Sequence, residues 1–170
     1  MSTTPGESRE QRFDSLEQEA FLNLWRTYDR MRAIEQDLFG RYDLTPQQYN
    51  ALRLLRAARQ RTDGKWPGRL ATLELASRLV SRAPDITRLL DPLERRGLVE
   101  RDRPADNRRV VCVGITEAGL DLLRELGEQV RACHTRQFGH LSEKELRDLI
   151  VLLRAARRPH EEPDSAWLDG

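Results

Sequence analysis

The chain has 170 residues, of which 34% are charged and 38% are hydrophobic, and its formal net charge is +1 at pH 7. This size and balance predict one globular domain. No run approaches the roughly 20 apolar residues that span a bilayer, and the N-terminus lacks the apolar core of a secretion signal. We therefore expect a cytoplasmic protein with no membrane partner.

The charges are distributed unevenly along the chain. Residues 51–110 hold 15 basic and 8 acidic side chains, a balance of +7, whereas the rest of the chain holds 14 and 20, a balance of −6. A basic lobe attached to acidic parts is typical of a module that faces phosphates. The alternative is an ordinary solvated surface without such a partner.

Residues 1–14 are polar and are predicted to be a disordered or loosely docked arm. Ser15 and Gln18 match a capping box, and apolar residues then recur every three or four positions up to Gly40. This pattern predicts a long helix over 15–40. Its apolar face comprises Phe21, Leu24, Trp25, Tyr28, Met31, Ile34 and Leu38. Because the helix has too few partners to bury this face, we expect it to form an interface.

Thr45, Pro46 and Gln48 predict the start of a second helix, with an N-cap, a proline at the first position and a capping-box glutamine. A loop with two glycines, a proline and four basic residues follows over 59–70. Trp66 in this loop either folds back onto the domain surface or covers a pocket or a partner site.

The next stretch predicts two short helices that meet at a tight turn. Thr72 is the expected N-cap of the first helix, and Pro84 is expected at the first position of the second. The second helix is predicted over 84–96, with Gly97 as its left-handed stop. Two short helices joined in this way form a helix-turn-helix unit.

Apolar and β-branched runs at 98–101 and 110–115 predict a β-hairpin, with turn residues at 104–107 between them. A hairpin directly after the second helix makes the unit a winged helix-turn-helix. Thr116 is then the expected N-cap of another long helix. The predicted fold is mainly α with a small β-hairpin wing, flanked by long N- and C-terminal helices.

The Ser142–Glu145 capping box predicts a last helix, and residues 159–170 form an acidic tail. The terminal helical regions, 15–40 and 116–158, carry apolar stripes that a monomer would expose to water. We therefore expect these regions to pair with a second copy of the chain as a homodimer.

Several short motifs follow one another between the second helix of the unit and the end of the wing. They are Ile86-Thr87-Arg88-Leu89, Leu93-Glu94, Arg96-Gly97-Leu98-Val99, Asp106, Arg108-Arg109-Val110, Ile115-Thr116 and Gly119. None is specific alone, but in this order they resemble the MarR family of bacterial transcriptional regulators. The resemblance extends over 15–158 and implies a homodimer whose winged helix lobe, 45–115, binds DNA. Pro92 departs from the family pattern, because proline lacks the backbone donor, and we expect it to kink the helix or loosen its second half.

The resemblance implies that the N-terminal half of the second helix enters the major groove of a pseudo-palindromic double-stranded DNA, while the wing reaches the backbone or the minor groove. Arginine suits guanine there, and aspartate suits cytosine. The candidate DNA-binding residues are Ser81, Arg82, Asp85, Thr87, Arg88, Asp106, Arg108 and Arg109. An alternative stays open for two of these residues. Arg88 could form a salt bridge with Asp85 or Asp91 along the helix instead of contacting DNA. Asp106 could orient a wing arginine, or it could only shape the turn.

The resemblance also implies an effector site where the terminal helices meet the DNA-binding lobe. Candidate residues, which suit a small aromatic or carboxylated compound, are Trp25, Tyr28, Arg32, Tyr49 and Arg53. The alternative is that most of them are ordinary core and surface residues. No cofactor or metal is expected, because Cys133 and His134 are adjacent and point to different helix faces. Cys112 and Cys133 have no CxxC spacing and are expected to be free thiols.

The resemblance, together with the basic lobe, thus predicts a sequence-specific regulator that binds double-stranded DNA, and the resemblance implies a repressor relieved by a small-molecule ligand. The alternative is a winged-helix protein-interaction module that does not bind DNA. An enzyme is not expected, because the chain has no nucleophile–base set and no glycine-rich phosphate loop.

Overall fold

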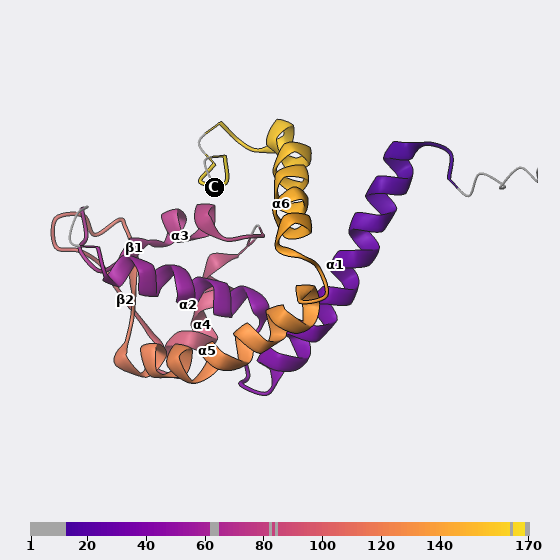
Figure 1. The fold of residues 1–170 in the computed structure, drawn as a ribbon. Helices are drawn as coiled ribbons and strands as arrows, with labels where there is room; N and C mark the ends of the chain where they lie inside the picture. The colour runs from indigo at the N-terminus through magenta and orange to yellow at the C-terminus, as the bar shows by residue number, and fades with distance from the viewer. Residues whose placement is uncertain (1–12, 62–64, 82, 84, 164, 169–170) are drawn as a thin grey trace, which may run out of the picture.

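The computed structural model describes residues 13–61, 65–81, 83, 85–163 and 165–168. The chain is mainly helical with a small antiparallel sheet (Figure 1), which confirms the predicted winged helix-turn-helix. In chain order the elements are α1 (Leu16–Gly40), α2 (Pro46–Arg59), β1 (Leu70–Ala71), α3 (Thr72–Arg78), α4 (Ile86–Arg95), β2 (Val99–Asp102), β3 (Cys112–Ile115), α5 (Glu117–Phe138), α6 (Glu143–Arg157) and a 3-10 turn, η1 (Arg158–His160).

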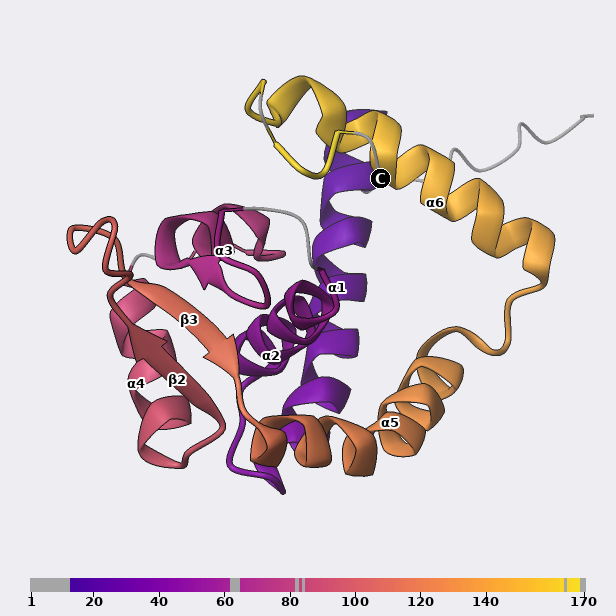
Figure 2. The same cartoon turned by 90° about the vertical axis from the view of Figure 1, so that its left-hand side faces the viewer.

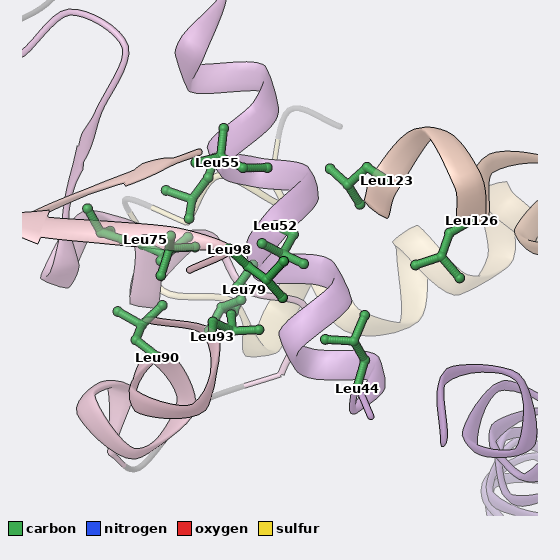
Figure 3. Close-up of a cluster of buried hydrophobic side chains, with 14 of the residues drawn as sticks. Leu44, Leu52, Leu55, Leu75, Leu79, Leu90, Leu93, Leu98, Leu123 and Leu126 are labelled. Atoms are coloured by element: carbon green, nitrogen blue, oxygen red, sulfur yellow. The ribbon is translucent and has the colours of Figure 1, made fainter. Parts of the chain in front are cut away.

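The core lies in the lobe formed by α2, α3, α4 and the sheet. Leucines from each of the three helices meet there, and the following are fully buried: Leu52, Leu55, Leu75, Leu90 and Leu93 (Figure 3). Complete burial of such a side chain stabilises the fold by about 1.5–3 kcal/mol. This packing fixes α4 and the sheet against a common base.

The sheet contains one strand more than the sequence predicted. Its order is β1-β3-β2, and Leu70 and Ala71 pair with Val113 and Cys112. The prediction of a two-stranded hairpin was therefore incomplete. A two-residue strand has no alternating pattern of its own, and only its partner reveals it.

Two of the three predicted capping boxes are confirmed in full. Thr45 pairs with Gln48, and Ser142 pairs with Glu145, through both side chains. Ser15 caps α1 by accepting from the Gln18 backbone N–H, but the Gln18 side-chain oxygen accepts from the backbone N–H of Asp14 rather than Ser15.

The prediction of Thr72 as an N-cap is wrong. Ala71 occupies the N-cap position of α3 and makes no side-chain cap bond. The backbone N–H of Thr72 donates instead to the Val111 carbonyl at 2.9 Å. Because β1 runs directly into α3, the sheet satisfies a donor that a cap would otherwise have to satisfy.

Helix α4 differs from the prediction at its start and tolerates the proline in its middle. It begins at Ile86 after the N-cap Asp85, and Pro84 lies outside the described residues. The helix continues for three residues beyond Pro92, and the carbonyl of Pro92 accepts from the N–H of Arg96 at 3.2 Å. The proline therefore does not end the helix. Gly97 has φ +67°, as expected for a left-handed stop.

The terminal helices expose apolar side chains. The N-terminal half of α1 extends away from the lobe and α6 stands apart from it (Figure 1), and no residue of α6 is buried. Trp25 on α1 is 61% exposed, and Leu152 on α6 is 67% exposed. No helix among the described residues is both long and apolar enough to span a membrane.

One arginine joins α2 to the base of the wing and to the start of α5. Arg59 donates from Nη1 to the Ile115 carbonyl at 2.9 Å, and its Nη2 pairs with the Glu117 carboxylate. The end of β3 and the first turn of α5 are thus held by the same side chain.

Gly119→Ala is expected to lower the free energy of unfolding by about 1–3 kcal/mol, because the start of α5 has no space for a methyl group. A Cβ at Gly119 would lie 2.3 Å from the Leu98 carbonyl oxygen and 2.7 Å from Ile115 Cγ1. Urea denaturation measures the effect. Gly127→Ala is the matched control, since outside the backbone of its own helix no atom of the described residues lies within 4 Å of its added Cβ. If both variants were equally stable, the close packing of α5 on Leu98 would be disproved.

Candidate nucleic-acid interface

The N-terminal end of α4 presents short polar and basic side chains. Asp85, the N-cap, accepts from the Arg88 backbone N–H at 3.1 Å through one carboxylate oxygen. Thr87 and Arg88 lie in the first turn and are exposed. Asp85 therefore has a structural task that the sequence analysis did not assign to it.

Arg88 is not held by the acidic residues that were considered as its partners. Asp91 pairs with Arg101 Nη2 at 2.7 Å, and Asp85 contacts only the backbone of Arg88 in the bonds observed. Across the part of the chain that the structure describes, Arg88 forms no ion pair. Its guanidinium can therefore meet an external partner without breaking an internal one.

Ser81 precedes α4 and is exposed. Its hydroxyl and its carbonyl both accept from the Gln47 amide, at 3.1 and 3.0 Å. Arg82, the other candidate in this turn, lies outside the described residues. The turn is therefore tied to the start of α2 through Gln47.

Arg101 attaches the wing to α4. On β2 it pairs with Asp91 at 2.7 Å and donates from Nε to Glu94 at 3.0 Å. The hydrogen bonds from Arg101 lower the pKa of Glu94 below its usual value, and they raise the pKa of Arg101. The role of Arg101 was not predicted from the sequence. Two carboxylates three residues apart on a helix, followed by a strand arginine, were the available signal.

The wing tip presents two exposed arginines, Arg108 and Arg109, in the loop between β2 and β3 (Figure 2). The Arg108 carbonyl accepts from Arg103 Nη1 at 2.9 Å, and the Asn107 side chain accepts from the Arg109 backbone N–H at 3.2 Å. These bonds hold the backbone of the loop and leave both guanidinium groups at the surface.

The expected partnership between Asp106 and a wing arginine is not observed. Asp106 Oδ2 lies 4.0 Å from Lys65 Nζ instead. The local turn chemistry comes from Asn107, whose side chain makes the bond within the loop. Asp106 is thus paired with a lysine forty-one residues away in the sequence rather than with a wing arginine. Residue spacing along the chain does not reveal such a distant partner.

A hollow of about 340 Å³ lies between the helix-turn-helix and the wing. It is lined by Thr72, Thr87, Arg101, Asp102, Arg103 and Val111. The candidate effector residues do not line it. Tyr49 is half-buried and stacks on Phe39 with ring centroids 4.5 Å apart, and burial raises its pKa. Trp25, Tyr28, Arg32 and Arg53 are exposed.

Both cysteines are buried, Cys112 on β3 and Cys133 on α5, and neither forms a disulfide. Burial raises the pKa of both thiols, which keeps them protonated near neutral pH. Among the described residues no group of three or more His, Cys, Asp or Glu side chains is placed to hold a metal ion.

The MarR family model matches residues 44–111. A MarR transcription factor from Planctomyces limnophilus is 56% identical, with 85% of this chain and 99% of that one covered and a TM-score of 0.64. The HTH-type transcriptional regulator FarR from Neisseria gonorrhoeae is 31% identical over 93 residues, which span 55% of this chain but only 58% of FarR.

A fold relative has been solved with DNA. Sco3205, a MarR family transcriptional regulator from Streptomyces coelicolor, has a TM-score of 0.76 over 95% of this chain and 99% of its own, at 17% identity. At that identity the likeness concerns the fold alone. The winged helix-turn-helix and the 56% identity to the Planctomyces limnophilus transcription factor over nearly its whole length define a transcriptional regulator. The chain belongs to the MarR family.

Proposed function

We propose that the chain forms a homodimer that binds a pseudo-palindromic double-stranded DNA sequence and represses transcription until a small molecule binds. The observation that carries this proposal is Arg88 at the start of α4, which is exposed and forms no ion pair within the part of the chain that the structure describes. It lies on the same lobe as the exposed Arg108 and Arg109. Fold and family are those of transcriptional regulators rather than enzymes, and we assign no catalytic step to the chain.

The exposed apolar faces of α1 and α6 support the homodimer. Burial of such faces drives association, and two-fold symmetry would then present two copies of α4. Two reading helices related in this way require half-sites about one helical turn apart. This is the reason to expect a pseudo-palindrome.

The proposed DNA contacts divide into base reading and backbone positioning. Arg88 and Thr87 would face base edges in the major groove, with Arg88 suited to guanine O6 and N7. Asp85 would face cytosine through the carboxylate oxygen that does not cap α4. Arg108 and Arg109 would contact phosphates or the minor groove, and the remaining candidates, Ser81, Arg82 and Asp106, would lie beside the backbone.

We also propose that an aromatic or carboxylated effector acts where the dimerisation helices meet the lobe. The candidates are Trp25, Tyr28, Arg32, Tyr49 and Arg53. In the dimer, a second chain would complete a site that the single chain leaves open. A ligand that prefers one spacing of the two lobes would shift the DNA affinity by its differential affinity for the two states.

The test is to recover genomic DNA fragments with the purified protein, sequence them, and measure affinity for the enriched sequence against salt. We expect an inverted repeat and a steep loss of affinity as salt rises, because neutralised phosphates release counterions. A scrambled duplex of equal composition is the control. Recovery of no enriched sequence would favour the alternative, a winged-helix module that binds proteins.

A further inference from the structure

The segment 65–70, between α2 and α3, is folded against the wing. Two backbone hydrogen bonds hold this segment. The Gly68 N–H donates to the Arg61 carbonyl at the end of the preceding helix at 3.3 Å, and the Arg69 N–H donates to the Trp66 carbonyl at 3.1 Å. Gly68 has φ +73°, a conformation that favours glycine. This turn directs Arg69 towards the sheet.

Arg69 crosses the sheet to reach its outer strand. Nη2 lies 2.6 Å from Glu100, and Nη1 lies 3.0 Å from Asp102. Both carboxylates belong to β2 and are two residues apart, so they project from the same face. The strand order β1-β3-β2 places β3 between the segment 65–70 and these partners.

Gly114 on β3 leaves the room for this crossing. It is paired with Glu100 across the sheet, and a Cβ at Gly114 would lie 3.2 Å from Arg69 Cγ and 3.8 Å from Arg69 Nε. The Arg69 stem therefore lies over the one β3 position without a side chain. The Arg69 side chain is 30% exposed, whereas the Glu100 and Asp102 side chains are 58% and 52% exposed, so these are surface ion pairs that solvent and salt partly screen.

A second tie reaches the wing loop. Lys65 Nζ lies 4.0 Å from Asp106 Oδ2 and 5.0 Å from the centroid of the Trp66 ring. Trp66 is half-buried, and its Nε1 is shielded from solvent. The indole thus lies back on the domain and supports the lysine, which agrees with one of the two alternatives for Trp66.

We propose that Lys65 and Arg69 form a wing brace, a set of positioning residues that fixes the wing relative to α4. The proposal rests on the proposed DNA-binding function of the wing. A short two-stranded ribbon is only marginally stable alone, and Arg101 anchors β2 from the α4 side. The wing brace anchors the same strand from the opposite side. It therefore sets where Arg108 and Arg109 stand when α4 enters the groove.

The test removes the acidic partners and leaves the basic residues in place. Glu100→Gln/Asp102→Asn deletes two negative charges beside the DNA-binding surface. Electrostatic attraction alone would then tighten DNA binding. The wing brace predicts the opposite, a loss of about threefold to tenfold in DNA affinity. Without the ion pairs to Arg69 the wing is less fixed relative to α4, so Arg108 and Arg109 contact the DNA less well. The matched control, Asp121→Asn/Glu128→Gln on α5, makes the same charge change away from the wing and should not weaken binding.

Two further variants separate positioning from charge. Gly114→Val keeps every charge and displaces the Arg69 stem, so it should lower affinity as the double variant does. Arg69→Lys keeps the charge, but a single ammonium does not hold two carboxylates as a guanidinium does, so its affinity should fall between wild type and Arg69→Ala. If the double variant or Gly114→Val bound DNA as tightly as wild type, or more tightly, the proposal would be overturned.

A measurement without DNA makes the two proposals separable. Hydrogen exchange of the amides in residues 99–115 should be faster in the double variant and in Gly114→Val, while the amides of α2 keep their rates. Unchanged exchange in the wing would overturn the wing brace, whatever the DNA results. Faster exchange in variants of a protein that binds no DNA would support the wing brace as a structural tie and would overturn only the regulatory function.

Discussion

Arg88→Ala is expected to weaken operator binding by about 1–3 kcal/mol per half-site and to relax selectivity at one base pair in each. The guanidinium lies exposed in the first turn of α4 and forms no ion pair among the described residues. Its removal therefore leaves no internal carboxylate without a partner, and the loss measures the contact with DNA. Competition between operator and scrambled duplex at two salt concentrations is the assay.

The wing arginines give the contrasting result in the same assay. Arg108→Ala/Arg109→Ala should weaken binding to operator and scrambled duplex alike, and should flatten the salt dependence by up to about two units per wing. Arg95→Ala is the control for the loss of one positive charge outside the proposed contacts, because Arg95 is an exposed arginine at the opposite end of α4. Equal losses on operator and scrambled DNA for Arg88→Ala would refute α4 as the reading helix. Normal binding by the wing variant would remove the wing from the interface.

Leu152→Glu is expected to separate the proposed dimer. Four consecutive apolar residues of α6, Ile150 to Leu153, are exposed, with Val151 at 63% and Leu152 at 67%. Consecutive positions point to different sides of a helix, so α6 is apolar around much of its circumference here, as in a buried helix. A charge there would remain uncompensated on association. Light scattering should give a mass of 19.8 kDa instead of twice that value.

The loss of the dimer should also lower operator affinity by about a hundredfold or more, because each lobe then binds its half-site without the effective concentration that linkage provides. Lys144→Gln on the same helix changes the net charge by the same amount and keeps the apolar residues. It should remain dimeric. A dimeric Leu152→Glu variant that binds normally would exclude this part of α6 from the interface.

Local signals predicted most of the helix starts and the wing strands. Thr45 with Gln48 and Ser142 with Glu145 are examples, because both partners of a capping box lie within one turn. Contacts between distant segments were not predicted. Strand β1 exists through its pairing with β3, Thr72 is satisfied by Val111, and Asp106 is paired with Lys65.

The candidate DNA site shows the same division. The exposed position of Arg88 follows from its place in the first turn of a helix, and those of Arg108 and Arg109 follow from their place in the loop between the two wing strands. The side chains that hold these elements in place, Arg69 and Arg101, were missed because their partners come from other elements. The side chains proposed to contact DNA can thus be found from local sequence, whereas the distance between α4 and the wing depends on contacts that form only in the folded lobe.

The two contacts of the Arg59 side chain couple α5 to the wing. One rigid guanidinium plane holds both the last carbonyl of β3 and the first carboxylate of α5, and Gly119 leaves no clearance between α5 and Leu98. Helix α5 and the wing therefore share one attachment point. We therefore expect a tilt of α5 to shift the end of β3 with it, and to displace the wing tip by more, because the tip lies further from this attachment point.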